Sequence, residues 1–160
     1  MVYIGGIIMK IVAENRKAKF EYFLEDCYEC GIVLTGTEIK GVRENNVSLK
    51  EAWCTIENNE LYIKQMHIAP YEKGMAYEVK KLSDGSRPRK LLVHKREIEI
   101  LKRGLMREGY TLIPVKVYFR DNKLKVEVAL AKGKKLYDKR EVSAARDVKR
   151  EMDRAVKGCY

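Results

Sequence analysis

Two alternating apolar runs joined by a two-residue turn dominate the C-terminal half of the chain, and they constrain its fold most strongly. Residues 111–133 read TLIPVKVYFRDNKLKVEVALAKG, with apolar residues at every second position on both sides of Asp121-Asn122. A period of two is typical of a β-strand with one buried face, and Asp and Asn tolerate the backbone of a tight turn. The pattern predicts an antiparallel hairpin. Pro114 is expected near the start of its first strand, where a missing N–H matters least.

Further strand-like runs precede this hairpin. The run 19–34 is rich in aromatic and β-branched residues and predicts a long strand with Phe20, Tyr22 and Leu24 on one face. The segment 52–68 predicts a second hairpin that turns at Asn58-Asn59. Parallel strands would need longer crossover helices than this chain offers. We therefore expect a mainly β fold with small helices, closed as an antiparallel barrel.

Two short helices are expected between the strands. Thr35 is a predicted N-cap with Glu38 three residues later, which is the spacing of a capping box. Residues 94–109 predict an amphipathic helix that stops at Gly109, while residues 73–89 contain turn residues and predict an exposed loop. The apolar side of the second helix is expected to comprise Ile98, Leu101, Leu105 and Met106.

The net charge points to a class of partner. The chain has 33 Lys+Arg and 23 Asp+Glu among 160 residues, a formal net charge of +10, and residues 132–160 carry half of that excess. A basic arm on a basic domain is typical of proteins that bind nucleic-acid phosphates, although a basic surface without any acidic partner gives the same composition. Other basic residues cluster before the long strand and around a short apolar run; they are Arg16, Lys17, Lys19, Arg87, Arg89, Lys90, Lys95 and Arg96.

No residue pattern indicates a catalytic, metal or cofactor site. Cys27 and Cys30 form a C-x-x-C pair, but a structural zinc site needs a second pair, and this motif falls inside a predicted strand. Glu25, Asp26 and Glu29 are expected to be solvated ion-pair partners, since no histidine or nucleophile accompanies them. We predict that the protein is not an enzyme and uses no metal or cofactor. A redox or metal role for the cysteine pair remains the alternative.

The ends of the chain differ from its middle. Residues 1–14 are an apolar leader that is too short to span a bilayer and lacks the features of a secretory signal, so a cytoplasmic protein with reduced thiols is expected. Either Met1 or Met9 could start it. Residues 15–131 form the predicted barrel domain and 132–160 a basic tail. The tail carries like charges at helical spacing and a thin apolar stripe, which favours a flexible segment that becomes helical on RNA; a helix docked on the barrel is the alternative.

Several motifs occur together in an order typical of one known family. They are NRKAKFEYFLEDCYECGIVLTGTEIKGVR, RPRKLLVHKREI, VKVYF with KVEVALAKGKK, and YDKR. From Asn15 to about Arg154 the chain thereby resembles the SsrA-binding protein (SmpB) family. The resemblance implies an OB-type antiparallel β-barrel with small helices, followed by a C-terminal tail that is unstructured in solution.

The resemblance also implies a function. Members of this family are not enzymes; they bind the tRNA-like domain of transfer-messenger RNA and deliver it, with elongation factor Tu, to ribosomes stalled without a codon in the A site. The tail is implied to enter the empty decoding centre and mRNA path of the small subunit and to fold there as a helix. Tagging of the nascent chain and ribosome rescue, together called trans-translation, follow.

The resemblance assigns two groups of residues. Asn15, Glu29 and Leu92 match positions that face the tRNA-like domain, where Glu29 is expected to accept hydrogen bonds from base edges. The basic residues beside them that we expect to bind RNA are Arg16, Lys17, Arg89 and Lys90. The tail residues expected to face the ribosome are Gly133, Lys134, Lys135, Tyr137, Asp138, Lys139 and Arg140.

Two alternatives concern how the protein would bind RNA. A ribosomal protein or a general single-strand binder with a basic barrel would show no preference for a tRNA-like fold. Tyr62 and Tyr118 lie at predicted strand positions and could stack on unpaired bases, although burial in the core is the expectation for each.

Overall fold

The C-terminal hairpin predicted from the sequence lies at the centre of the structure, a computed structural model that describes residues 2–4, 7–69, 85–135 and 152. Strands β9 (Tyr110–Arg120) and β10 (Lys123–Gly133) pair antiparallel around Asp121 and Asn122, whose φ angles are 48° and 61°. Positive φ at both turn residues is the geometry of a tight hairpin. Pro114 lies inside β9 rather than near its start, at the point where the register shifts, and a bulge tolerates a residue without an N–H.

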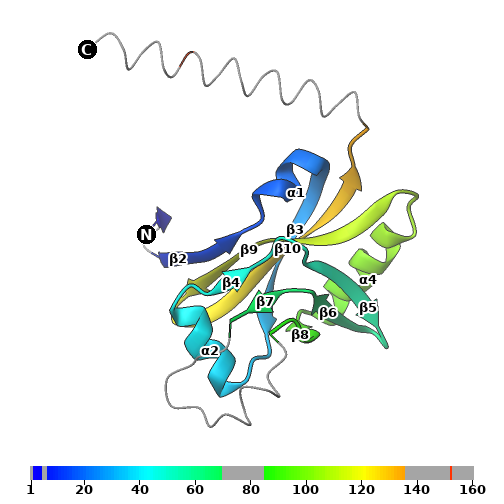
Figure 1. Ribbon diagram of the computed structural model, residues 1–160. Helices are drawn as coiled ribbons and strands as arrows, with labels where there is room; N and C mark the ends of the chain where they lie inside the picture. The colour runs from blue at the N-terminus through cyan, green and yellow to red at the C-terminus, as the bar shows by residue number, and fades with distance from the viewer. Residues whose placement is uncertain (1, 5–6, 70–84, 136–151, 153–160) are drawn as a thin grey trace.

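Further strands join the hairpin and form a ring within the described part of the chain (Figure 1). The order is β9-β10-β3-β8-β6-β5, and the pair Cys54–Leu112 returns β5 to β9. This ring confirms the expected mainly β, OB-type architecture. The second predicted hairpin is also present, with Asn58 and Asn59 at positive φ. The bounds are β3 (Tyr22–Ile32), β5 (Trp53–Glu57), β6 (Glu60–Lys64) and β8 (Arg89–Leu92).

Residues before Asn15 extend the sheet beyond this ring. β2 (Ile7–Glu14) pairs antiparallel with β9, and β1 (Val2–Ile4) pairs with β2. Part of the segment 1–14, which we expected as a leader, is therefore sheet. A separate two-stranded sheet consists of β4 (Val47–Ser48) and β7 (His67–Ile68). The predicted loop at 73–89 lies mostly outside the described residues.

A helix that the sequence analysis did not predict precedes β3. α1 (Arg16–Glu21) begins where the Asn15 side chain accepts a hydrogen bond from the Ala18 N–H, a typical N-cap. Phe20 belongs to this helix, so the expectation that it shares a strand face with Tyr22 and Leu24 is wrong. The aromatic run resembled a strand because a six-residue helix contains too little periodicity to be recognised.

The two predicted helices are present and pack at different sides of the ring (Figure 1). α2 (Gly36–Arg43) begins with the expected capping box between Thr35 and Glu38. α4 (Lys95–Leu105) buries Ile98 and Leu101. It ends before the predicted stop at Gly109, so Met106 is 85% exposed instead of lying on the apolar side.

The ring encloses an apolar core that also contains one fully buried charge. Inward-facing residues of the strands, including Leu61, Val117 and Val126, are 0% exposed. The Arg89 side chain at the start of β8 is equally buried, and Glu38 on α2 provides its counter-charge at 2.8 Å. The remaining Arg89 donors reach backbone carbonyls, those of Met66, Arg87 and Gly85.

Glu38 connects this buried arginine to the start of α2. Its carboxylate also accepts hydrogen bonds from the Arg87 guanidinium at 2.6 and 2.9 Å and from the Thr35 N–H at 2.8 Å. Burial alone would raise the pKa of Glu38, but these hydrogen bonds and the charge of Arg89 lower it below its usual value. One carboxylate thus joins the N-terminus of α2 to the first residues of β8.

We expect Glu38→Gln to lower the free energy of unfolding by about 3 kcal/mol at pH 7, because it leaves Arg89 as a buried charge without a counter-charge. Urea titration measures this change. Since the folded-state pKa of Glu38 is depressed, its contribution is present above the unfolded-state pKa and is lost as the pH falls through the folded-state pKa.

The exposed Glu44 at the end of the same helix is the matched control. Glu44→Gln should change the unfolding free energy by less than about 0.5 kcal/mol. Equal urea midpoints for the two variants would contradict the assigned role of Glu38.

Candidate nucleic-acid interface

Charged side chains cover the outer face of the sheet in register. Glu29 on β3 lies opposite Glu127 on β10, Glu127 lies opposite Lys116 on β9, and Lys116 lies opposite Glu14 on β2. Residues directly opposite each other on neighbouring strands face the same side of a sheet, so the four form one row. With about 4.8 Å between strands, the row spans about 14 Å.

Glu29 is the centre of a hydrogen-bonded cluster on this face. Its Oε2 accepts hydrogen bonds from the Tyr118 hydroxyl and from Arg120 Nη1 at 3.1 Å, and its Oε1 accepts from the same Nη1 at 3.3 Å. Lys125 Nζ lies 3.7 Å from Oε1. Burial alone would raise the pKa of Glu29, but Tyr118, Arg120 and Lys125 lower it, so the carboxylate is ionised at neutral pH.

The Tyr118 hydroxyl holds this carboxylate in place by donating a hydrogen bond to it. Its ring is only 2% exposed, as expected for a buried residue, which rules out stacking on a base. Burial and the hydrogen bond to Glu29 raise the pKa of the Tyr118 hydroxyl, so it remains a donor at every physiological pH. Tyr62, the other aromatic considered for stacking, is partly buried and donates its hydroxyl to Glu60.

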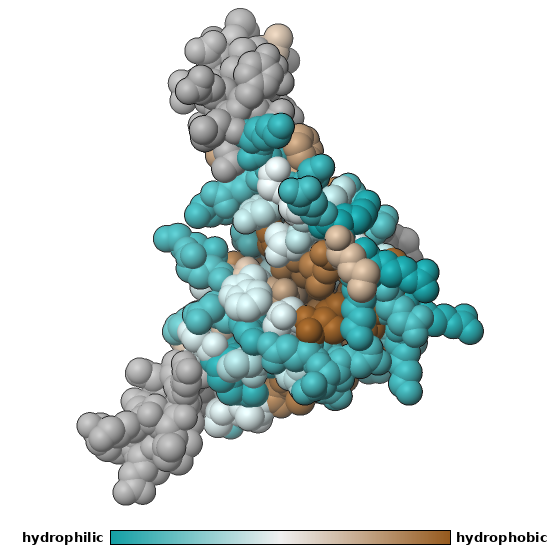
Figure 2. Space-filling view, turned by 90° about the vertical axis from the view of Figure 1, so that its right-hand side faces the viewer, coloured by the Kyte–Doolittle hydropathy of each residue, from teal (hydrophilic) through white to brown (hydrophobic). Residues whose placement is uncertain are grey.

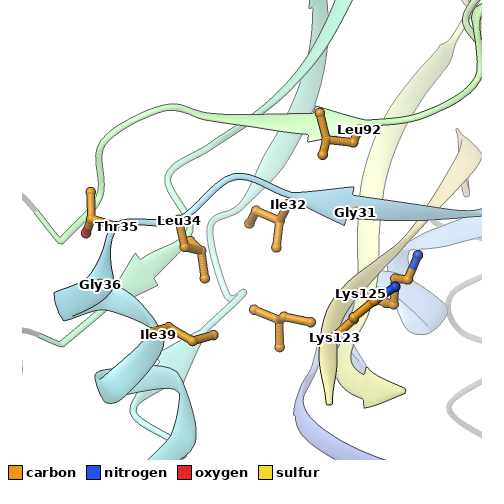
Figure 3. Close-up of a pocket in the computed structure, with 10 residues that line it drawn as sticks. Gly31, Ile32, Leu34, Thr35, Gly36, Ile39, Leu92, Lys123 and Lys125 are labelled. Atoms are coloured by element: carbon orange, nitrogen blue, oxygen red, sulfur yellow. The ribbon is translucent and has the colours of Figure 1, made fainter. Parts of the chain in front are cut away.

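A groove adjoins the Glu29 cluster (Figure 3). Leu92 on β8 stands opposite Gly31 on β3 and is 53% exposed. A Cβ at Gly31 would lie 3.3 Å from the Leu92 Cβ, so the glycine leaves room for the leucine. The groove encloses about 550 Å³ between β3, β8, α2 and the turn end of β10; its lining includes Ile32, Leu34, Thr35, Ile39, Lys123, Leu124 and Lys125. An apolar floor beside lysines suits an unstacked nucleotide.

The N-terminal group of predicted RNA-binding residues lies at the other end of the charged row. Asn15 is only 7% exposed; besides capping α1, it donates its side-chain amide to the Pro114 carbonyl at 3.3 Å. Arg16 and Lys17 on α1 are exposed, and Lys17 pairs with Glu21 at 3.5 Å. The sheet therefore places Leu92 opposite Gly31, two residues along β3 from Glu29, and leaves Glu14, which precedes α1 in the chain, about 14 Å from Glu29.

The two basic residues of β8 differ from each other. Arg89 was predicted to bind RNA directly, but its guanidinium is fully buried against Glu38 and backbone carbonyls, which favours a structural role for it. Lys90 has 40% of its side chain exposed and forms an ion pair with Glu60, which raises the pKa of Lys90. Of the two basic residues of β8, Lys90 is therefore the one with an exposed side chain that is available to RNA.

The start of the predicted tail is attached to the barrel. Gly133 is the last residue of β10, and the Lys134 N–H donates to the Glu21 carbonyl at 2.9 Å. Lys134 Nζ donates to the Lys19 carbonyl at 3.0 Å and lies 4.9 Å from the Phe23 ring centroid. Lys135 is exposed. The other predicted ribosome-facing residues, Tyr137, Asp138, Lys139 and Arg140, lie outside the described residues.

The two cysteines of the C-x-x-C pair lie in different environments. Cys27 is exposed whereas Cys30 is fully buried, and burial raises the pKa of Cys30 to about 12. Among the residues described, no group of three metal-binding side chains occurs. No helix in the same part of the chain is long and apolar enough to cross a membrane.

The face beside α4 provides a comparison surface. Figure 2 shows this side of the molecule, where hydrophilic side chains surround a patch of apolar ones. A smaller cleft between α4 and the barrel contains Ile100, which is 49% exposed, and Arg107, which pairs with Glu25 at 3.0 Å as expected for that carboxylate. None of the predicted RNA-binding residues lines this cleft.

The sequence analysis missed three basic residues near the groove. Arg120, Lys123 and Lys125 lie at the turn end of the β9–β10 hairpin, at positions that alternate with the core residues. The alternation of apolar and polar residues in the two strands could have identified them, because the polar residues of such a strand share its outer face.

Comparisons with known proteins agree with these observations. The sequence model of the SmpB protein family matches residues 12–158. An SsrA-binding protein of Caldanaerobacter subterraneus subsp. tengcongensis is 52% identical over 93% of this chain and 92% of the relative, and one of Roseiflexus castenholzii is 48% identical over 96% and 95%. A solved structure described as "tmRNA-SmpB: a journey to the center of the bacterial ribosome" aligns with a TM-score of 0.63 and 41% identity, covering 78% of this chain and 85% of that one. The chain belongs to the SmpB family of SsrA-binding proteins.

Proposed function

We propose that this chain is a non-enzymatic RNA-binding protein of trans-translation. It binds the tRNA-like domain of transfer-messenger RNA and brings this RNA to stalled ribosomes. The related solved structure, whose description names transfer-messenger RNA, SmpB and the bacterial ribosome, supports the proposal. The observation that carries it is the outer face on which an ionised Glu29 adjoins the exposed Leu92 and the basic edge of the groove.

This face has the chemistry that recognition of a folded RNA requires. Folded RNA is recognised through its shape, its phosphates and a few accessible bases. A rigid sheet supplies the shape, lysine and arginine side chains supply phosphate contacts, and the groove beside Leu92 can accept an apolar nucleotide surface. α1, with Arg16 and Lys17, extends the same contact surface toward β2.

The tail acts on the ribosome in this proposal. Residues beyond Lys134, including Lys135, Tyr137, Asp138, Lys139 and Arg140, enter the empty decoding centre and mRNA path and contact small-subunit ribosomal RNA, while Gly133 and Lys134 hold the start of the tail on the barrel. Elongation factor Tu accompanies the complex during delivery. The composition of the tail supports this division of labour, since a highly charged segment gains order where phosphates neutralise its charge.

We expect Leu92→Ala to weaken binding to the tRNA-like domain of transfer-messenger RNA about fivefold, because half of a leucine side chain would lose its contact with RNA. The control Ile100→Ala removes a similarly exposed apolar side chain on α4 and should leave the affinity unchanged. Fluorescence-based binding at physiological salt measures both. Equal losses in the two variants would contradict the assignment of the Leu92 face.

A truncation separates the two proposed activities. Because β10 runs to Gly133 and Lys134 is bonded to α1, the stop is placed after Lys135 so that the barrel retains these contacts. The truncated chain should melt like the full chain and bind the tRNA-like RNA with the same preference over an unrelated structured RNA. It should not support peptide tagging on stalled ribosomes.

Two outcomes would contradict this scheme. If the full chain shows no preference for the tRNA-like RNA, a general basic RNA binder becomes the better description. If the truncated chain supports tagging, the tail is not the ribosome-reading segment.

A further inference from the structure

We infer that Arg120, Lys123 and Lys125 form a binding site for a phosphate of the RNA backbone, and that Glu29 and Tyr118 position Arg120 in this site. The inference rests on the proposed function, because the phosphate belongs to the RNA bound there. It changes the role of Glu29 from a direct reader of bases to a residue that acts through a neighbouring cation.

The three cations meet at one end of the outer face. Arg120 lies opposite Lys123 across the β9–β10 pair, and Lys125 lies opposite both Tyr118 on β9 and Gly31 on β3. Lys123 and Lys125 also line the groove that contains Leu92 (Figure 3). A phosphate bound by these side chains would therefore lie at the edge of the groove, where a nucleotide on the apolar floor would present it.

The donors of Arg120 are only partly used. Within the described part of the chain its hydrogen bonds to Glu29 both come from Nη1, which leaves the Nε–Nη2 edge without a protein partner. That edge carries two parallel N–H donors, the geometry that binds a phosphate through two hydrogen bonds. Lys123 has no ion-pair partner among the described residues.

The acceptors of Glu29, in contrast, are largely used. A carboxylate has about four lone-pair sites, and here Oε2 accepts from both Tyr118 and Arg120 while Oε1 accepts from Arg120 and faces Lys125. A base edge would have to displace one of these donors. Because Glu29 already holds Arg120 in place, this side chain loses less conformational entropy when RNA binds.

The charges of the cluster also favour an anion. Arg120 and Lys125 flank the carboxylate of Glu29, and Lys123 lies opposite Arg120. Of the other acids nearby, Glu127 is neutralised by Lys116 at 2.9 Å, and Asp121 lies in the turn. The side chain of Arg120 is 39% exposed, so part of it is accessible to a ligand from solvent. The site thus keeps a net positive charge while its guanidinium is fixed in orientation.

The test measures the salt dependence of binding between the full chain and the tRNA-like domain RNA. Arg120→Gln should weaken binding about tenfold at physiological salt and reduce the slope of log K against log salt by about one. Arg120→Lys should keep the slope but recover only part of the affinity, because a lysine lacks the fork of donors. Thermal melting checks that each variant is folded.

The matched control is Arg107→Gln. Arg107 pairs with Glu25 much as Arg120 pairs with Glu29, with a similar distance and exposure, but it lies in the cleft beside α4. This variant should leave both the affinity and the salt slope unchanged. Equal behaviour of the Arg107→Gln and Arg120→Gln variants would overturn the inference.

A double-mutant cycle tests how Glu29 acts. If it acts through Arg120, the double variant Glu29→Gln/Arg120→Gln should bind no more weakly than Arg120→Gln alone. Additive losses would show that Glu29 contacts the RNA directly and would overturn its positioning role. The preference of the unmodified chain for the tRNA-like RNA over an unrelated RNA tests the proposed function separately, so the two failures are distinguishable.

Discussion

Antiparallel pairing of β9 with β10 is the interaction on which the rest of the molecule depends. The other edge of β10 pairs with β3. The other edge of β9 pairs with β2 and with the start of β5, so strands distant in sequence are joined through this hairpin. The inner faces of both strands form the core, with Val117 and Val126 as cross-strand partners. Their outer faces carry the cations of the candidate interface. One pleated hairpin therefore sets both the stability of the barrel and the spacing of its charges.

The buried Arg89–Glu38 pair has a comparable influence on a smaller scale. Arg89 begins β8 and Leu92 ends it, so the contact that fixes the start of this short strand also determines where the exposed leucine stands. A buried ion pair is costly to desolvate, and it persists here because every donor group of the guanidinium has an oxygen acceptor. The arginine thus supports the candidate RNA interface from inside the barrel without forming part of its surface.

Patterns with a short period could be predicted from the sequence. The two hairpins and the capping box of α2 follow from alternation and from turn or cap residues within a few positions of each other. α1 was missed because it is short, and the end of α4 was misplaced because amphipathic spacing continues past Leu105.

The features of the candidate site that the sequence did not indicate have a different physical origin. Burial of Arg89 depends on Glu38, which is 51 positions away in the sequence, and no local pattern reveals such a partner. The same holds for the cluster around Glu29, which joins three strands that only the register brings together. Glu29 and Leu92 were recognised through family motifs, whereas their proximity to Arg120 and Lys125 is a property of the fold.

The attachment of Lys134 to α1 has a geometric consequence. Its backbone and ammonium groups are bonded to carbonyls at the end of the same helix that presents Arg16 and Lys17. When an RNA holds α1, the remaining chain starts from a point fixed relative to that RNA. In the proposed function, the contour length from this point limits how far any residue of the tail can lie from the RNA, and a target within that limit meets the tail at a high effective concentration. In the proposed function, Lys134 is therefore the point from which the reach of the tail is measured.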